Sequence, residues 1–338
     1  FFEETGAGGV ILFKRNFESL RQLRRFVDDL QKAAADAGCG PLIVSVDQEG
    51  GRVARFRDPF TVVPAMGALG SAADAEEGLA FEVGRLFARE LAAVGVNCDH
   101  APVLDVATNP ANPVIGDRSF SHDPGVVSRL ACEFIRGMQG EGVAACGKHF
   151  PGHGDTDVDS HLGLPLLHHT RGRFDACELV PFRAAIGAGV ASIMTAHLLI
   201  PNLDGENPAT VSRAITTEIL RRELRFDGLV FTDCLTMEGI AAKHPAGEAA
   251  WRAVSAGADV AVICHGREKQ AAALEGLRRA AGEGALDEAR LEESYGRIRR
   301  FKERFCNPDS RPEIPGWKRP SLRVIGSREH QKLVSRIR

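Results

Sequence analysis

The sequence has little of several features that mark whole classes of protein. Aromatic residues make up only 6% of its 338 residues, which argues against a base-stacking platform for single-stranded nucleic acid. The formal net charge is −3, so no basic surface for nucleic acid or for an anionic membrane is indicated. No apolar run reaches the roughly 18 residues that a membrane-spanning helix requires. We therefore expect neither nucleic acid nor a membrane as a partner.

Closely spaced cysteines are also missing. The eight cysteines form no CxxC pair and no cluster along the chain, so neither a zinc knuckle nor a dense disulfide framework is indicated. Dispersed thiols in a chain of this size are typical of small buried side chains in a reducing compartment, which predicts a cytoplasmic protein. The chain begins at Phe1 rather than at Met, which leaves room for an upstream targeting segment.

Short apolar runs alternate with amphipathic stretches along the chain. The seven expected strands are residues 9–13, 42–47, 97–105, 143–149, 191–197, 228–233 and 260–265. The expected helices between and after them are 20–36, 75–94, 124–141, 178–188, 215–224, 248–256 and 287–305. Buried runs separated by helices indicate βαβ units and a parallel sheet. Polar residues end almost every run, which favours a (β/α)₈ barrel over a doubly wound sheet with a single switch point.

The number of expected strands is one short of eight. The fold that we predict is an α/β, TIM-like (β/α)₈ barrel over residues 1–305 that lacks its first strand. We expect the chain to begin inside the first helix of a longer barrel, or to be truncated, because an open barrel would leave two unpaired edges. Residues 306–338 are expected to form a C-terminal tail, packed or extended, to which we assign no function.

The densest polar segment is KHFPGHGDTDVDSH, residues 148–161. It follows an expected strand and contains Gly and Pro, so it is expected to form a loop over the strand ends. Asp159 and His161 are two residues apart and share a face in an extended stretch. A carboxylate beside an imidazole favours its protonated form, and such a histidine can donate a proton to a leaving oxygen. A solvated surface loop is the alternative interpretation.

Two further segments place polar groups at strand ends. Asp233, in FTDCLTMEG, ends an apolar run and is either a nucleophile or the N-cap of the next helix. In VDQEGGRVARF, two glycines follow a strand end that carries Asp47. They either allow a ligand to approach the backbone closely or form a plain turn. The string GDRSF lies in a long loop, 107–123, of a length typical of lids and binding loops.

Four strings in this order, VDQEGGRVARF, NPVIGDRSF, KHFPGHGDTDVDSHLGLP and VFTDCLTMEGI, resemble family 3 glycoside hydrolases, specifically the single-domain bacterial β-N-acetylhexosaminidases of cell-wall recycling. The resemblance covers about residues 8–305. It implies retaining, two-step hydrolysis, with Asp233 as nucleophile, His161 as acid/base and Asp159 as its dyad partner. The implied sugar contacts are Asp47, Arg55, Arg118, Lys148 and His149. Cys234 departs from the pattern, because many relatives carry a second Asp there.

The resemblance also implies a substrate and the absence of a cofactor. The expected substrate is a glycan with terminal, non-reducing β-linked N-acetylglucosamine, such as N-acetylglucosaminyl-anhydro-muropeptides from peptidoglycan turnover. No cofactor or metal is expected, and the protein is expected to be a monomer. An imidazole–carboxylate dyad replaces the second carboxylate of the usual glycosidase scheme.

Three alternatives remain open at this point. Six loop residues could be drawn as a metal site (His149, His153, Asp155, Asp157, Asp159 and His161), although their spacing matches no HExxH motif. A phosphorylase is closer, since a His acid/base repels a phosphate nucleophile less than a carboxylate would. The last alternative is a sugar-binding protein without catalytic activity.

Overall fold

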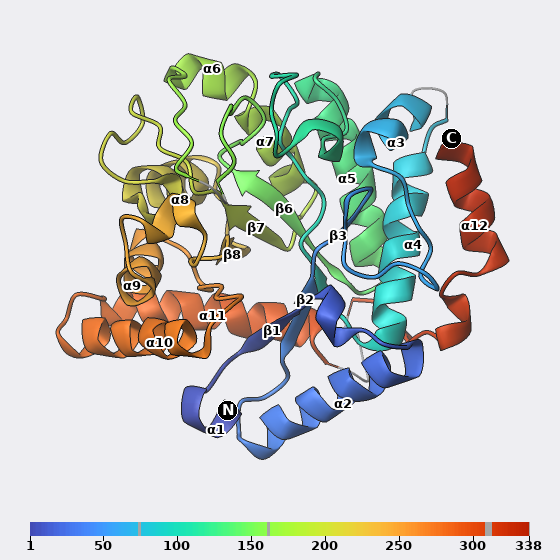
Figure 1. The fold of residues 1–338 in the computed structure, drawn as a ribbon, viewed down its shortest axis with the longest axis horizontal. Helices are drawn as coiled ribbons and strands as arrows, with labels where there is room; N and C mark the ends of the chain where they lie inside the picture. The colour runs from blue at the N-terminus through green and yellow to red at the C-terminus, as the bar shows by residue number, and fades with distance from the viewer. Residues whose placement is uncertain (74–75, 161–162, 308–312, 338) are drawn as a thin grey trace.

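A single parallel sheet forms the centre of the molecule (Figure 1). The computed structural model describes residues 1–73, 76–160, 163–307 and 313–337. Its six strands lie in the order β1-β2-β5-β6-β7-β8, and every pair is parallel. Their bounds are Gly9–Leu12, Ile43–Val46, Cys98–Asp99, Ala144–Phe150, Ser192–Thr195 and Leu229–Thr232. The sheet curls into a half-barrel with helices outside it, which confirms the α/β barrel architecture expected from the sequence.

Two expected strands are shorter than predicted. Of residues 97–105 only β5 is a strand, because Pro102 has no N–H to donate to the ladder; Val103 then forms an isolated bridge with Lys148. Of residues 260–265 only Val260 pairs, in an isolated bridge with Phe231. Within the described part of the chain, no strand pairs with the second edge of β1. A cavity of about 480 Å³ lies there, lined by β1 and by residues 259–264.

The helices surround the sheet in two groups (Figure 1). The first group is α2 (Leu20–Asp36), α3 (Met66–Ala73), α4 (Leu79–Val94), α5 (Pro124–Gly140) and α7 (Leu179–Gly187). The second is the π-helix η4 (Ala214–Glu223), α9 (Ala246–Ala256), α10 (Arg267–Gly282) and α11 (Glu288–Phe305). The prediction for 20–36 matches α2, and the predicted helix 75–94 is α4, which begins at Leu79, whereas α3 and α10 were not expected. Among the described residues, no helix combines the length and apolarity needed to cross a membrane.

Glycines allow the closest helix packing. α4 and α5 lie side by side, and a Cβ on Gly84 would come within 2.2 Å of the Phe134 carbonyl oxygen. On the opposing helix, a Cβ on Gly137 would come within 2.1 Å of the Phe81 carbonyl oxygen. Only residues without a side chain permit this distance between two helix backbones. The helix pair therefore packs tightly behind the strands that carry the polar loops.

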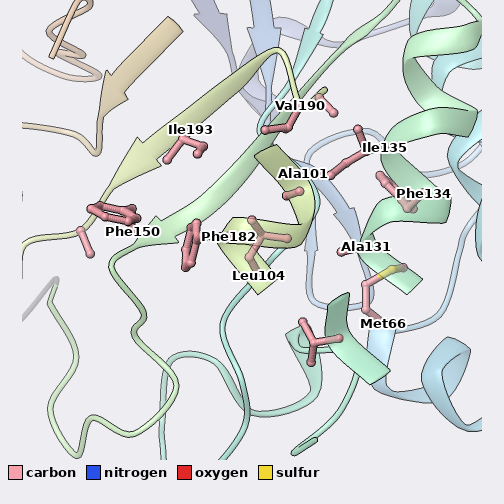
Figure 2. Packing of buried hydrophobic residues seen from close by; sticks show 14 of the residues in the cluster. Met66, Ala101, Leu104, Ala131, Phe134, Ile135, Phe150, Phe182, Val190 and Ile193 are labelled. Atoms are coloured by element: carbon pink, nitrogen blue, oxygen red, sulfur yellow. The ribbon is translucent and has the colours of Figure 1, made fainter. Parts of the chain in front are cut away.

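Phenylalanine packing fixes the strand that leads into the predicted loop. The rings of Phe150, at the end of β6, and Phe182, on α7, meet edge to face with centroids 5.2 Å apart (Figure 2). Ile193 on the neighbouring strand β7 joins the same buried cluster. Edge-to-face aromatic pairs contribute about 0.5–1.5 kcal/mol beyond the area that they bury. The carboxyl end of β6, with Lys148 and His149, is thus held rigidly.

The described part of the C-terminal segment packs against α4 and neighbouring elements. The Trp317 indole N–H donates to the Glu141 carbonyl at 3.0 Å. Helix α12 (Arg328–Val334) lies beside α4 (Figure 1), where His330 Nδ1 is 2.7 Å from Glu90 Oε1. The division into a domain over 1–305 and a tail over 306–338 stays a prediction.

Candidate active site

Polar side chains from several elements meet at the carboxyl ends of the strands. Asp47 follows β2, and Glu49 lies in the short strand β3 (Gln48–Gly50) directly after it. Lys148 and His149 belong to β6, as expected, and Arg118 ends the 3-10 helix η2 (Gly116–Arg118). In a barrel of parallel strands these ends share one mouth, which is where such folds carry their chemistry.

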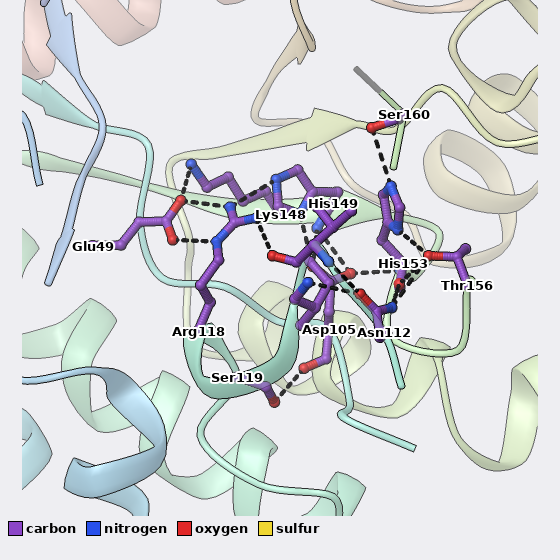
Figure 3. Close-up of polar contacts among 12 residues, drawn as sticks. Glu49, Asp105, Asn112, Arg118, Ser119, Lys148, His149, His153, Thr156 and Ser160 are labelled. Atoms are coloured by element: carbon purple, nitrogen blue, oxygen red, sulfur yellow. Dashed lines mark hydrogen bonds and ion pairs between the residues drawn. The ribbon is translucent and has the colours of Figure 1, made fainter. Parts of the chain in front are cut away.

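Two carboxylates and two cations form a buried cluster in this mouth; Figure 3 shows three of them, Glu49, Arg118 and Lys148. Lys148 Nζ lies 2.9 Å from Asp47 Oδ1 and 2.6 Å from Glu49 Oε1. Arg118 donates to both oxygens of Glu49, each at 2.8 Å. Burial would raise the pKa of Glu49, but Arg118 and Lys148 lower it to about 2. Burial would lower the pKa of Lys148, but Asp47 and Glu49 raise it above its ordinary value. All four groups are therefore charged at neutral pH.

Asp47 connects the buried cluster to the partly exposed side chain of Arg55. Arg55 follows β4 (Val53–Ala54) and donates to Asp47 Oδ2 at 2.9 Å. The strands β3 and β4 form a hairpin, and its turn explains the two glycines of the sequence. Gly51 has φ +55°, and a Cβ there would come within 2.8 Å of the Ala65 Cα. Gly51 therefore allows close approach to the protein's own backbone at Ala65. This agrees with the interpretation of the two glycines as a plain turn.

A carboxylate that the sequence analysis did not select holds His149. Asp105 is fully buried, and its Oδ2 lies 2.7 Å from His149 Nδ1. On the other side of the ring, Arg118 Nη2 lies 3.3 Å from Nε2. Because arginine only donates, this contact needs Nε2 without a proton, so Nδ1 carries the proton and donates to Asp105. The only signal in the sequence was the position of Asp105 at the end of an expected strand.

Hydrogen bonds join the loop after β6 to the loop that precedes η2. His153 Nδ1 lies 2.7 Å from Thr156 Oγ1, and its backbone N–H donates to Asp105 Oδ1 at 2.7 Å. Asn112 donates to the His153 carbonyl at 2.8 Å (Figure 3). Burial lowers the pKa of His153 to about 4, so this imidazole is neutral at pH 7. His153 therefore stabilises the loop through these hydrogen bonds.

The far end of this loop comes back toward β8. Gly239, at the start of helix α8 (Glu238–Ala241), donates its N–H to the Ser160 carbonyl at 3.0 Å. Asp159, just before it, is partly exposed. The predicted acid/base His161 lies outside the described residues. Ser160, the residue before it, is thus bonded to the segment that begins with Asp233.

Asp233 lies at the end of β8, partly exposed. The Cys234 N–H donates to Asp233 Oδ1 at 2.7 Å. Burial would raise the pKa of Asp233, but His197, the Cys234 N–H and Lys148 together lower it below its ordinary value. Asp233 follows β8 at the carboxyl end of the sheet, the end at which the buried cluster also lies, and is within electrostatic range of Lys148. It is an ionised carboxylate, the form required of a nucleophile.

The helix-cap alternative for Asp233 is wrong. Helix α8 begins at Glu238, and its N-cap is Met237, without a side-chain cap bond. A further residue that the sequence analysis did not select, His197, lies at the end of the neighbouring strand. Its Nε2 is 3.0 Å from the Cys234 carbonyl; since a carbonyl only accepts, Nε2 donates. His197 therefore supports the residue that follows Asp233.

The structure thus brings together six of the eight residues singled out in the sequence: Asp47, Arg55, Arg118, Lys148, His149 and Asp233. Among the described residues, no group of three or more His, Cys, Asp or Glu side chains is arranged to hold a metal ion. What the mouth offers is the ionised carboxylate of Asp233, the imidazole of His149 and the fixed cationic donors Lys148 and Arg118. This combination suits a neutral, hydroxyl-rich ligand whose reacting carbon is attacked by a carboxylate.

Residues 2–301 match the model described as the glycosyl hydrolase family 3 N-terminal domain. A β-hexosaminidase of Tolumonas auensis is 44% identical over 272 residues, which are 80% of this chain and 79% of that protein.

Solved structures agree with this match. A family 3 β-N-acetylglucosaminidase from Paenibacillus sp. strain FPU-7 superposes with a TM-score of 0.92 at 44% identity. The match covers 99% of this chain but only 63% of that one. NagZ from Neisseria gonorrhoeae, in complex with N-trifluoroacetyl-D-glucosamine, superposes with a TM-score of 0.76 at 32% identity, over 98% of this chain and 89% of that one.

Proposed function

Because the chain belongs to glycosyl hydrolase family 3, we propose that it is a retaining β-N-acetylhexosaminidase that removes terminal, non-reducing β-linked N-acetylglucosamine. The observation that carries the proposal is the position of Asp233. This ionised carboxylate follows β8 at the carboxyl end of the sheet, within electrostatic range of Lys148. The relatives named β-hexosaminidase support the substrate class.

Asp233 is the proposed nucleophile. Its carboxylate attacks the anomeric carbon, and a covalent glycosyl-enzyme forms while the bond to the leaving oxygen breaks. His161, held by Asp159, gives its proton to that oxygen. In the second step His161 takes a proton from water, which attacks the anomeric carbon and frees Asp233. The bond between Gly239 and Ser160 supports this assignment, because it holds the residue before His161 near the start of α8.

The proposed sugar contacts are Asp47, Arg55, Arg118, Lys148 and His149. Lys148 has three N–H donors, and its ion pairs with Asp47 and Glu49 occupy two of them. The direction of the third N–H is then fixed by the two ion pairs. Such fixed donors stabilise charge that develops on a sugar hydroxyl in the transition state without reorganisation.

For the physiological role, we propose fragments of peptidoglycan turnover as the substrate, of the N-acetylglucosaminyl-anhydro-muropeptide type. The protein would act in the cytoplasm as a monomer, with no cofactor and with no nucleic acid or membrane as a partner. The resemblance of its four motifs to the enzymes of cell-wall recycling supports this role.

The decisive experiment is to trap the intermediate. A 2-fluoro sugar with a good leaving group should label the peptide that contains Asp233, and Asp233→Ala and His161→Ala should each abolish hydrolysis of a chromogenic β-N-acetylglucosaminide. Asp227→Ala is the matched control, since Asp227 is an exposed aspartate before β8, at the opposite end of the same strand. Full activity of Asp233→Ala would discard the mechanism.

Two added reagents separate the remaining alternatives. Hydrolysis should be the same with and without a chelator, whereas a metal-dependent hydrolase would lose activity. With phosphate present, the product should remain free N-acetylglucosamine. Accumulation of the sugar 1-phosphate would instead identify a phosphorylase.

A further inference from the structure

Two cysteines lie in contact beside the proposed nucleophile. Cys234 follows Asp233, and Cys264 lies near the end of the adjacent segment 260–265. The Cys264 N–H donates to Cys234 Sγ at 3.3 Å, and the two thiols interact electrostatically. Thr236 Oγ1 lies 3.1 Å from Cys234 Sγ. Both cysteines are free thiols, and the proposed mechanism gives neither side chain a role.

The backbone places the two cysteines on neighbouring segments. The segment after β8 runs beside 260–264 and is bonded to it at several points, including Thr232 N to Val260 O at 3.0 Å and Leu235 N to Val262 O at 2.9 Å. Neighbouring extended segments lie about 4.8 Å apart. A disulfide spans about 4.4–6.8 Å between Cα atoms, a range that includes this spacing, and the Cys264 N–H already contacts Cys234 Sγ.

Their surroundings favour a reactive thiolate. Hydrogen bonds from Cys264 and Thr236 lower the pKa of Cys234 below its ordinary value, although burial opposes this, and the same contact raises the pKa of Cys264. The thiolate is the form that reacts with oxidants. Cys264 is partly exposed and lines the cavity beside β1, so a small oxidant can reach the pair.

Another neighbouring pair of cysteines shows the contrast. Cys98 and Cys146 lie on the adjacent strands β5 and β6 and are fully buried. Burial raises the pKa of both thiols, that of Cys146 to about 12. A thiol without access or thiolate character is inert. Reactivity is thus concentrated at Cys234 and Cys264.

We propose that Cys234 and Cys264 are a site of reversible oxidation by peroxide, and that the disulfide formed there switches off the enzyme. The Cys234 thiolate attacks one oxygen of hydrogen peroxide; the S–O bond forms, the O–O bond breaks and hydroxide leaves. The Cys264 sulfur then attacks Cys234 Sγ; the S–S bond forms, the S–O bond breaks and the second oxygen leaves as water with the Cys264 proton. Two thiols lose two electrons, and peroxide is reduced to two waters.

The backbone of Cys234 connects this chemistry to catalysis. Its N–H holds the Asp233 carboxylate and its carbonyl accepts from His197. An S–S bond of about 2.05 Å is much shorter than a contact between two thiols, so it draws Cys234 toward Cys264 and away from Thr236. Displacement of a reacting group by about 1 Å can cost on the order of 100-fold in rate. This effect on activity rests on the proposed function, whereas the oxidation site does not.

The experiment treats the reduced protein with increasing hydrogen peroxide. Peptide mapping by mass spectrometry without a reductant should find Cys234 linked to Cys264. Hydrolysis of the chromogenic β-N-acetylglucosaminide should fall at least 10-fold in step with this cross-link and return after dithiothreitol. Each protein is scored by the ratio of its own activities before and after peroxide. Cys264→Ser should keep a ratio near one, whereas the matched control Cys39→Ser, which removes the other partly exposed cysteine, should behave as the wild type.

Each outcome decides a separate claim. If no 234–264 cross-link forms while activity is lost, or if the loss persists in Cys264→Ser, the oxidation site is overturned. A complete cross-link with unchanged hydrolysis overturns the switch. If the reduced protein shows no hydrolysis at all, the proposed function fails, and the peptide map still decides whether the oxidation site exists.

Discussion

Replacing Glu49 by Gln should destabilise the protein by about 3 kcal/mol at pH 7, with little change in shape. Arg118 and Lys148 overcome the effect of burial and lower the pKa of Glu49 from 4.5 to about 2. That change corresponds to roughly 3 kcal/mol of unfolding free energy. The side chain is only 2% exposed, so solvent screens this interaction little. For 338 residues, an unfolding entropy of about 0.7 kcal/mol/K converts it into a fall in Tm of about 4–5 °C.

The pH dependence has a definite sign. A carboxyl whose pKa is lowered on folding stabilises the protein fully above pH 4.5, and this contribution is lost as the pH falls toward 2. The difference between wild type and Glu49→Gln should therefore shrink from about 3 kcal/mol at pH 7 to about 2 kcal/mol at pH 3.5. Urea unfolding followed by circular dichroism at each pH measures this difference in unfolding free energy.

The control for this experiment is Glu82→Gln, which removes a half-exposed ion pair with Arg85. It should cost less than about 1 kcal/mol. A difference below about 1 kcal/mol for Glu49→Gln, or one that stays constant between pH 7 and 3.5, would refute the reasoning about the buried cluster.

Three further predictions follow from other contacts. Gly154→Ala should lower kcat/KM by on the order of 100-fold with little change in Tm, because a Cβ there would lie 1.8 Å from the Val106 carbonyl and displace the loop. The lowered pKa of Asp233 keeps it ionised to below pH 3.8, so the acid limb of a kcat/KM profile should lie below that pH, and a nucleophile limb above pH 4.5 would contradict this. His330→Ala should cost about 1.5–3 kcal/mol in urea unfolding, because Glu90 loses a buried charge-assisted partner.

Local signals explain which elements were predictable from the sequence. Helix α2 has a serine cap, with Gln22 N donating to Ser19 Oγ, and a strong apolar face. Helix α10 was not expected because its buried positions are Ala273, Gly276 and Ala280. A Cβ on Gly276 would come within 2.3 Å of the Gly247 carbonyl oxygen. A face made of such small residues packs closely but gives almost no hydrophobic periodicity.

The ends of the strands were predictable, but the pairing of their side chains was not. An apolar run that ends in Asp, Lys or His identifies a strand end, and this placed Asp47, Lys148 and Asp233 at one mouth. Glu49 and Asp105 also lie at or near expected strand ends. Glu49 binds Arg118 and Asp105 binds His149, and each of these partners comes from a distant part of the chain. Partner choice of this kind depends on the register of the sheet and on the path of the 106–118 loop, which one sequence does not determine.

These pairings change how the proposed sugar contacts must be understood. The sequence presents five independent polar residues, whereas in the structure Lys148 and Arg118 bind carboxylates that are themselves buried. Removing one member of such a buried ion pair is costly mainly because it leaves the other charges buried and unpaired. What the arrangement provides is fixed geometry, since every donor is oriented before a ligand arrives. Glu49 thereby acts on the ligand through Lys148 and Arg118, so its loss should disorder both donors at once, even though it need not touch the sugar.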